Sequence, residues 1–513
     1  MERPVVLPSR ILLTGASGYI GSALLPELLA AGCRVRCFVR DRSHALFSDA
    51  AVEVIAGDVF DVASLREALR GIDTAFYLIH SLGDGRRFAE RDREAATNFA
   101  SVARSAGVRR IIYLSGLGDA DGYLSAHLRS RQEVGEILRS SGVQVIELRT
   151  SIVIGPGSLS FEMIRALTER LPVMTTPRWV DIETQPIGIA DLVHYLLASL
   201  MSDTSESIVY EIGGADRASY GELMREYARQ RRLRRWIIPI PLLTPKLSSL
   251  WLALVTPLYA TTGSALIDGV RSRTVVQDAH ALQELPVRPM GYRQAIAEAL
   301  ALDDRQWDAR LQTDRIVPTR KSAYWKVQLV GTRYLDSRTV TVPVSAAAVF
   351  NRIARIGGTQ GYYFADWLWR LRSLIDAAIG GVGSRRTSSG SSIPSPGEII
   401  DFWHVEACEP GRRLLLRADM KLPGRAWLQF SILPEGDRCH LRQTAVFDAR
   451  GLFGILYWWM TLPIHRWLFA GMLRNLAGRC RPGEDAESDQ CALAGTAHCH
   501  IGEDTMSCRR SDV

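Results

Sequence analysis

The stretch ILLTGASGYIG at residues 11–21 determines how the first half of this chain folds. The run ILLT is typical of a buried strand, and SALLPELLAAG, which follows at residues 22–32, has the apolar spacing of a helix. A strand, a turn with glycine at positions 15, 18 and 21, and a helix form the first unit of a dinucleotide-binding sheet. The sequence therefore predicts an α/β fold with a phosphate-binding turn near its start.

The three glycines of this turn have separate predicted roles. Gly15 permits the tight bend, Gly18 lets the backbone approach a pyrophosphate, and Gly21 lets the helix pack closely on the strand. The N-terminus of the helix adds unpaired N–H groups and a partial positive charge. We expect the diphosphate of the cofactor to contact this segment, at Thr14, Gly15, Ser17, Gly18, Tyr19, Ile20 and Gly21. A tight turn without a ligand is the alternative.

The residues after the second strand indicate which dinucleotide is bound. A 2′-phosphate favours arginine at this place, whereas a free 2′-hydroxyl favours a carboxylate. Arg40 occupies the position and Arg42 can assist, so NADP(H) is predicted, while Asp41 keeps NAD open as the alternative. Asp58 and Val59, after the third strand, are expected beside the adenine, although Asp58 could instead cap a simple turn.

The rest of the first half alternates short apolar runs with helical patterns, which is the rhythm of a doubly wound parallel sheet. Strands are predicted at Arg10–Thr14, Arg34–Val39, Glu53–Ala56, Thr74–Ile79, Arg110–Ser115 and Gln144–Arg149. Helices are predicted between them, at Ser22–Ala31, Ser64–Leu69, Arg87–Ser105 and Ser130–Ser140. We assign residues 1–205 to this Rossmann domain. Residues 206–305, which include a proline-rich apolar stretch at 236–258, are predicted to form a cap on the substrate side.

A polar stretch at Asp303–Ser322 precedes a different pattern. Strands are predicted at Arg338–Val342, Glu398–Val405, Arg412–Met420, Ala426–Leu433 and His440–Phe447, with helices at Ser345–Ala354 and Leu452–Ala477. This order predicts an α+β domain over residues 322–480. Ser384–Gly397 has the composition of a flexible loop inside it. Residues 481–513 are polar and without apolar periodicity, so they are predicted to be disordered.

Composition excludes some classes of protein. The chain has 513 residues and a formal net charge of +7, but its arginines are scattered through every segment, so no nucleic-acid partner is expected. Eight cysteines form no disulfide framework, and no signal peptide is recognisable, so a cytoplasmic location is expected. The Cys and His residues of the tail fit no zinc spacing, and no metal site is predicted.

One apolar segment, Leu452–Gly471, is long enough to be tested as a membrane span. Pro463, His465 and Arg466 lie past its middle, and a central arginine costs about 2.5–3.5 kcal/mol on insertion scales. We therefore expect a buried or interfacial helix, with contact at the inner face of a membrane as a further expectation.

Several short motifs resemble those of the atypical short-chain dehydrogenase/reductase superfamily. They are the glycine turn, FVR at 38–40, GDV at 57–59, YLSG at 113–116 and LRTSIVIGPGS at 148–158. The most similar groups are the NmrA-like proteins and relatives of the nucleotide-binding accessory subunit of respiratory complex I. The last domain resembles in pattern the helix-grip (START/SRPBCC-like) fold, whose members enclose an apolar ligand. The resemblance implies a nicotinamide dinucleotide as cofactor and, for the last domain, an apolar small molecule.

The superfamily's catalytic pair is a tyrosine followed four residues later by a lysine. The matching helix here has His127 and Arg131 at those positions, and Ser115 matches the serine that orients the substrate. Arg131 is also expected to reach the ribose of the cofactor. His127 can exchange a proton near neutral pH with its unperturbed pKa of about 6.5, although a role away from the substrate remains open. Two further residues, His80 and Ser81, end the fourth strand and are expected to line the nicotinamide pocket or to cap it.

Three functions are compatible with these features. The first is an NADP(H)-dependent oxidoreductase acting on a lipid, isoprenoid or quinone-like substrate. The second is a non-catalytic NAD(P)(H)-binding redox sensor or assembly factor, which the replacement of Tyr-x-x-x-Lys by His-x-x-x-Arg favours. The third is a lipid-binding protein at a membrane surface, against which the intact glycine turn argues.

Overall fold

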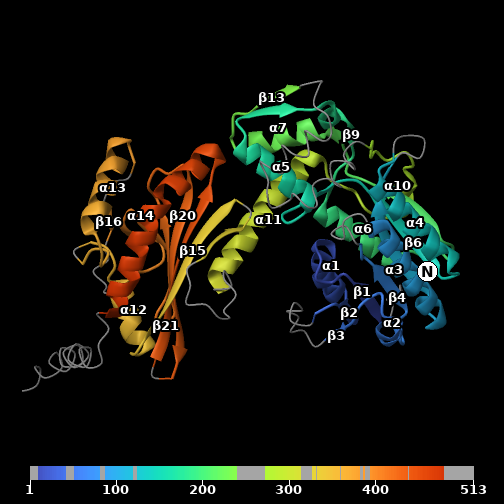
Figure 1. Ribbon diagram of the computed structural model, residues 1–513, viewed down its shortest axis with the longest axis horizontal. Coiled ribbons are helices and arrows are strands. Elements are labelled where there is room, and N and C mark those ends of the chain that lie inside the picture. Colours follow the sequence, from blue (N-terminus) through green and yellow to red (C-terminus); the bar gives the residue numbers. More distant parts are fainter. Residues whose placement is uncertain are drawn as a thin grey trace, which may run out of the picture. The chain divides into compact units, whose positions relative to one another are not determined.

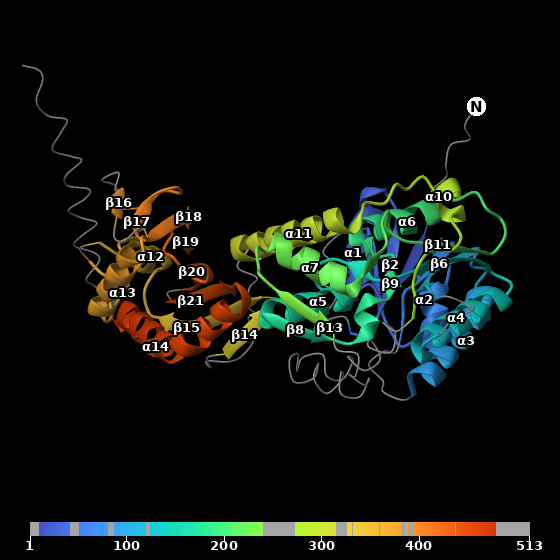
Figure 2. The same cartoon turned by 90° about the horizontal axis from the view of Figure 1, so that it is seen from above.

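The computed structural model of the protein describes residues 10–41, 51–80, 87–118, 124–239, 272–313, 326–330, 332–358, 360–381, 385–387, 393–436 and 438–478. The chain divides into two compact units, Met1–Trp307 and Asp308–Val513. Each unit has its own β-sheet and its own apolar core (Figure 1, Figure 2).

The first unit is built on a seven-stranded parallel sheet in the order β11-β6-β5-β4-β1-β2-β3. Its strands are β1 Ile11–Thr14, β2 Val35–Val39, β3 Val52–Ala56, β4 Thr74–Tyr77, β5 Arg110–Gly116, β6 Gln144–Thr150 and β11 Ile208–Ile212. The direction of winding reverses between β1 and β4, as in a doubly wound Rossmann sheet. The predicted fold class is therefore confirmed.

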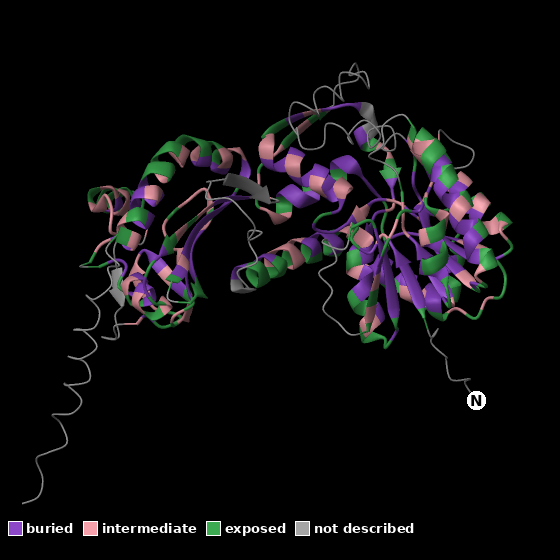
Figure 3. Ribbon diagram, turned by 60° about the horizontal axis from the view of Figure 1, so that its bottom comes forward, coloured by how far each residue is buried: buried purple, intermediate pink, exposed green. Residues whose placement is uncertain are grey.

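Helices cover both faces of this sheet. One face carries α1 and α6, and the other carries α2, α3 and α4; their bounds are α1 Tyr19–Ala30, α2 Val62–Leu69, α3 Phe88–Ser105, α4 Ala126–Ser140 and α6 Ile189–Met201. Three of them begin earlier than the sequence pattern predicts, α1 by three residues, α2 by two and α4 by four, because Gly18, Asp61 and Ser125 are the N-caps. Figure 3 shows the strands of this sheet buried and the outer sides of its helices exposed.

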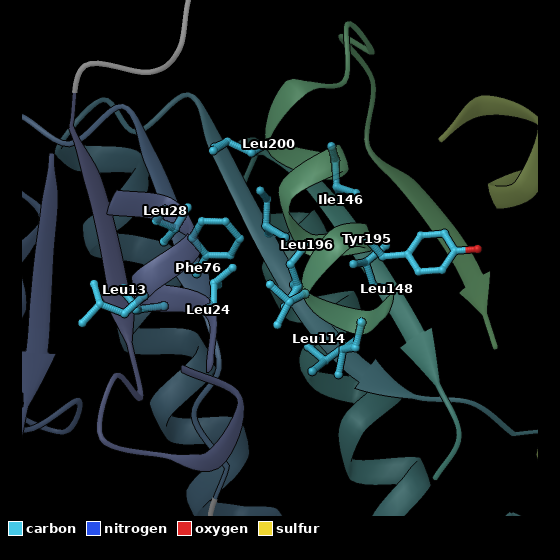
Figure 4. Close-up of a cluster of buried hydrophobic side chains, with 14 of the residues drawn as sticks. Leu13, Leu24, Leu28, Phe76, Leu114, Ile146, Leu148, Tyr195, Leu196 and Leu200 are labelled. Carbon is cyan, nitrogen blue, oxygen red and sulfur yellow. The ribbon is translucent and has the colours of Figure 1, made fainter. Parts of the chain in front are cut away.

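Alternation along the strands sends neighbouring side chains to opposite faces. Leu13 and Phe76 join α1 and α6 in one apolar cluster, part of which Figure 4 shows. Leu12 and Tyr77 join α2 and α3 in the other cluster. All four side chains are at most 1 % exposed, so the central strands are buried on both faces, as parallel strands usually are.

A smaller layer of helices and short strands lies beyond the carboxyl ends of the strands. Its elements are β7 Val153–Ile154, α5 Leu159–Arg170, β8 Val173–Thr176, β9 Glu183–Thr184, β10 Ile187–Gly188, β12 Ala218–Ser219, α7 Tyr220–Gln230, β13 Trp236–Pro239 and α11 Tyr292–Thr313. The short helix α10 His280–Glu284 packs instead on the sheet, in the apolar cluster of α1 and α6. An apolar cluster joins α5, α7 and α11. This cap thus takes up residues before 205, where the sequence placed a domain limit, because the chain leaves the sheet after β6 and returns only for β11. Most of the stretch at 236–258 lies outside the described residues.

The second unit contains an antiparallel sheet in the order β14-β15-β21-β20-β19-β18-β17-β16. Its elements are β14 Lys326–Val330, β15 Arg333–Val342, α12 Ala346–Ala354, α13 Asp366–Ala378, β16 Arg385–Thr387, β17 Ile399–Asp401, β18 Trp403–Glu409, β19 Arg413–Ala418, β20 Gly424–Glu435, β21 Arg438–Ala449 and α14 Gly451–Gly478. The α+β prediction is confirmed. The loop predicted at Ser384–Gly397 needs a correction, because β16 forms there and pairs with β17.

Helices α12 and α14 pack on the sheet of the second unit through one apolar cluster. Phe350 of α12 and Met472 of α14 are nearly inaccessible and meet Leu428 and Leu441 of the central strands. The helix predicted at Leu452–Ala477 is therefore present as α14, packed along one side. Among the described residues, no helix is both long enough and apolar enough to cross a membrane.

The first prediction concerns the contact between α1 and the turn before it. Gly21→Ala would place a methyl group against the carbonyl oxygen of Gly15, which is backbone and cannot move aside. Overpacking of this kind costs about 1–3 kcal/mol, so we expect a melting temperature several degrees below that of the wild type. Ser22→Ala changes the neighbouring, exposed position of the same helix and serves as the matched control. Equal melting temperatures for both variants would show that α1 does not pack as described.

Candidate nucleotide-binding and active site

A pocket of about 550 Å³ lies at the carboxyl ends of the parallel strands in the first unit. Its walls come from the glycine turn after β1, the ends of β4, β5 and β6, the start of α4 and the loop leading to α5. This is the crevice in which doubly wound sheets bind their ligands, next to the point where the strand order reverses.

The glycine turn forms one side of the pocket and has the predicted geometry. Gly15 has a left-handed backbone, with φ at +68°, and the Gly18 N–H donates a 2.8 Å hydrogen bond to the Gly15 carbonyl oxygen. Gly18 is the N-cap of α1 and has no side-chain cap. Ser17 and Gly18 are exposed, so the first N–H groups of α1 open toward a ligand that carries negative charge.

Thr14 stabilises this turn through two hydrogen bonds of its side chain. Its hydroxyl donates to the Phe76 carbonyl oxygen at 2.9 Å and accepts from the Leu78 N–H at 3.0 Å. These two hydrogen bonds join the end of β1 to the end of β4 at the pocket. The Thr14 side chain is fully buried and does not line the pocket, so it holds the turn in place from within the sheet.

The residues predicted around the adenine lie outside this pocket. Arg40 is exposed directly after β2. The Asp58 carboxylate accepts the Phe60 N–H at 3.1 Å, and Val59 is buried in the apolar cluster under α2. Asp58 therefore stabilises a turn, which is the alternative that the sequence left open for it. Arg40 stays exposed and is available to a ligand. Ser81 and Arg42 lie outside the described residues.

Helix α4 brings the predicted catalytic residues into the pocket. His127 and Arg131 are four residues apart, which places them on one face of the helix, and both line the pocket with Ser115 and His80. Arg131 is 8 % exposed, donates to the Leu114 carbonyl oxygen and lies over the Tyr113 ring, 5.2 Å from its centroid. The guanidinium group is thus fixed to β5 at the back of the pocket.

Four polar atoms at this pocket have no hydrogen-bond partner within the described part of the chain. They are buried groups of residues that line the pocket: the hydroxyls of Tyr19, Ser115 and Thr150, and Nδ1 of His127. Buried polar atoms in folded proteins are nearly always paired, so unpaired ones gathered at one cavity indicate that a polar ligand completes them. A nicotinamide dinucleotide, with ribose hydroxyls and a carboxamide, fits this requirement.

Electrostatics sets the charge of the two histidines. Loss of solvent and, second, the positive charge of Arg131 lower the pKa of His127 to about 4, so the ring is neutral at neutral pH. His80 is exposed to the pocket but enclosed on its other sides, and burial, Arg131 and His127 lower its pKa as well. The expectation that His127 titrates near neutral pH therefore needs a correction.

Sequence reasoning included Tyr19 in the pocket wall but missed the residues opposite it. The Tyr19 hydroxyl reaches across to Gly155 and Gly157, where a side chain would collide with it or touch its ring. Thr150 lies at the end of β6, and Ser158 caps α5. The motif at 148–158 was the available signal, since it follows a strand at the carboxyl edge and combines small with hydroxyl side chains.

Comparison with known families identifies both units. Residues 15–154 match a family described as NAD(P)H-binding, and residues 329–472 match a family of proteins of unknown function, DUF2867. The N-terminal part thus matches an NAD(P)H-binding family, and a separate domain with a different family match follows it. The helix-grip assignment of this second domain stays a prediction.

Individual relatives match over parts of their length. Sterol demethylase protein B of Methylococcus capsulatus is 37 % identical over 112 residues, which are 21 % of this chain and 34 % of that protein. The ceramide reductase of Caulobacter vibrioides is 29 % identical over 168 residues, or 32 % of this chain and 52 % of that protein. The chain thus matches a third to a half of these relatives. The Escherichia coli NADPH-dependent quinone oxidoreductase QOR2, solved with NADPH, covers 56 % of this chain and 99 % of its own at 19 % identity, with a TM-score of 0.46.

The second prediction is a titration of the His127 ring by NMR in the ligand-free protein. We expect a midpoint near pH 4, because burial and Arg131 both disfavour the charged ring. Arg131→Gln should raise the pKa by removing one cause, and Arg131→Lys, which keeps the charge, should leave it low. A midpoint near 6.5 in the wild type would contradict the packing described for α4.

The same shift predicts how stability depends on pH. In the unfolded chain the His127 ring regains a pKa of about 6.5, so between pH 6.5 and about 4 the unfolded chain binds a proton that the folded unit does not. The contribution of His127 to stability is therefore present above pH 6.5 and is lost as the pH falls through this window. Denaturant unfolding of wild type and His127→Asn at pH 7 and pH 5 measures this difference.

Proposed function

We propose that the first unit is an NADP(H)-dependent oxidoreductase that acts on an apolar substrate of the lipid, isoprenoid or quinone class. The observation that carries this proposal is the pocket itself. It begins at the N-terminus of α1 and the glycine turn, and it continues to unpaired hydroxyl and imidazole groups at the ends of β5, β6 and the start of α4.

The preference for NADP(H) over NAD rests on Arg40. This arginine follows β2, at the position where the 2′ substituent of the adenosine ribose is recognised in such sheets. An exposed guanidinium forms bidentate hydrogen bonds to a phosphate. The carboxylate of the neighbouring Asp41 would instead favour the free 2′-hydroxyl of NAD.

The substrate class follows from the remaining wall of the pocket. Apolar side chains lie between the polar groups, from Leu114, Leu117, Leu128, Ile152, Val153 and Leu159. The relatives named above are described as a sterol demethylase protein and a ceramide reductase. Both names refer to lipids, which supports an apolar substrate; for its reduction, one carbonyl oxygen has to be oriented.

The polar groups then have separate roles toward that oxygen. When bound, the reduced nicotinamide supplies the hydride. Ser115 and the neutral ring of His127 would donate hydrogen bonds to a substrate carbonyl oxygen, a role that their unpaired atoms at the pocket support. Arg131, fixed to the Leu114 carbonyl oxygen, would hold the position of His127 and contact a ribose hydroxyl.

A second candidate function is a non-catalytic NAD(P)(H)-binding sensor. The observation that favours it is the lowered pKa of His127, which leaves few protonated rings at neutral pH to deliver a proton. Nucleotide binding would be the same in both functions, and only turnover separates them.

The third prediction tests cofactor choice. We expect Arg40→Glu to weaken NADPH binding at least tenfold and NADH binding by much less, because the new carboxylate repels only the 2′-phosphate. Arg109→Glu makes the same charge change before β5, at the opposite, amino-terminal edge of the sheet, and is the control. Titration by nucleotide fluorescence gives both affinities. Equal losses for the two nucleotides would refute the role of Arg40.

The fourth prediction separates enzyme from sensor. Purified protein is mixed with NADPH and a panel of quinones, enones and sterol or long-chain ketones, and nucleotide oxidation is followed. The oxidoreductase predicts turnover that falls about 10²–10⁴-fold in His127→Ala, the usual range for a lost proton-transfer or orienting group, with NADPH affinity kept. Binding without turnover on the whole panel, unchanged in His127→Ala, would favour the sensor.

A further inference from the structure

The second unit exposes the apolar faces of two helices. On α13 and its C-cap the exposed large apolar side chains are Trp367, Leu371, Leu374, Ile375 and Ile379. On α14 they are Phe453, Leu456, Trp459, Met460, Ile464 and Trp467. These eleven residues are called the apolar docking face below. Phe453 is 82 % exposed and Met460 77 %, so the face is open to solvent along its length in this unit.

The spacing shows that each helix has two apolar sides. The exposed residues recur every three or four positions, which keeps them on one face of a helix. The opposite side of α14 is buried in the core through Leu468, Met472 and Leu476, and α13 is anchored by Trp369. The core is therefore complete without the exposed residues. A contiguous exposed apolar surface of this kind marks a binding site in soluble proteins.

The two helices are fixed to each other where their exposed faces adjoin. The Phe364 ring, just before α13, meets the Trp467 ring edge-on at a centroid distance of 4.7 Å. The Asn475 side chain of α14 donates a 2.7 Å hydrogen bond to the Tyr363 carbonyl oxygen. These contacts hold the start of α13 against the C-terminal half of α14, next to Trp467.

The charges on these helices all have one sign at the surface. The exposed charged side chains of α13 and α14 are arginines, namely Arg370, Arg466 and Arg474. The two carboxylates of α13 are engaged in the fold, because Asp366 accepts the Tyr362 N–H at 2.7 Å and the buried Asp376 accepts the Lys421 N–H at 2.7 Å. Two apolar helices whose exposed charged side chains are arginines are complementary to an apolar phase with anionic groups at its border.

We propose that the apolar docking face binds the surface of an anionic lipid bilayer. Three of its eleven residues are tryptophans, which favour the boundary between headgroups and acyl chains. Helices with one apolar face and basic flanks lie in this boundary without crossing it. The proposal concerns the second unit and does not rest on the oxidoreductase proposed for the first.

Two other occupants fit less well. A symmetric dimer through this face would bring together two copies of the same helices, whose exposed charged side chains are all arginines, so no exposed carboxylate of these helices would pair with them. The chain beyond Arg481 is polar and without apolar periodicity, so it lacks the side chains to cover eleven apolar ones. A membrane surface avoids both difficulties.

Co-sedimentation of the full chain with vesicles tests the proposal. We expect binding to vesicles of phosphatidylcholine with one-quarter phosphatidylglycerol, weaker binding to pure phosphatidylcholine, and at least a tenfold lower partition for Phe453→Glu/Met460→Glu. Both substituted positions are more than three-quarters exposed, so folding should be retained, and circular dichroism checks it. Leu282→Glu, at an exposed apolar position of α10 in the first unit, should bind like the wild type.

The outcomes separate the possible occupants. Wild-type protein that stays in solution with both kinds of vesicle overturns the proposal. Loss of a dimer in the double variant, measured by sedimentation velocity without lipid, would assign the face to a second copy and would also overturn it. Unchanged vesicle binding in the double variant would place the lipid contact elsewhere. Because NADPH affinity is measured separately, none of these results depends on the function of the first unit.

Discussion

The close approach of helix α1 to the backbone of the preceding turn is the contact on which the nucleotide pocket depends. A side chain at Gly21 would overlap the Gly15 carbonyl oxygen, and one at Gly15 would require an unfavourable left-handed backbone and press on Leu78. Because these side chains are absent, the N-terminus of α1 lies directly beyond β1, and its N–H groups open into the cavity. An anion there is stabilised by the helix dipole and by unpaired donors together.

The same packing of the turn on the sheet also determines which groups face the glycine turn across the pocket. Thr14 joins β1 to β4 through two hydrogen bonds of its hydroxyl, so the two strands on either side of the winding reversal hold a constant separation. The next strand, β5, carries Ser115 into the cavity and holds Arg131 of α4 through the Leu114 carbonyl oxygen. The chemical groups are therefore positioned by the rigid sheet, and the apolar substrate wall is added by β6 and the segment after it.

The extent to which sequence predicts this structure differs between its parts. The strands and the glycine turn follow from local periodicity, because buried parallel strands read as short apolar runs and only glycine fits the turn. The meeting of His127 and Ser115 followed from a motif match rather than from periodicity. The lowered pKa of His127 could not be predicted, because it depends on burial and on Arg131 together. Strand β16 lies in a run rich in arginine, serine and glycine, where pairing with β17 rather than local preference decides the structure. Helix α13 was not predicted, although DWLWRLRSLIDAA at 366–378 has the apolar spacing of a helix.

The predicted match of His127 and Arg131 to a Tyr-x-x-x-Lys pair implies a reversal of the electrostatics of that pair. A cation beside a phenol lowers the pKa of a neutral acid and makes its proton easier to give. A cation beside an imidazole instead disfavours the protonated form, so burial and, second, Arg131 lower the pKa of His127 and leave it a neutral hydrogen-bonding group. A site with this pair is suited to orienting a carbonyl oxygen, and its proton must come from another donor or through His127 from solvent. Arg131 is buried against the Tyr113 ring, which keeps its guanidinium group in place. This arrangement of Arg131 and His127 is therefore a fixed property of the fold.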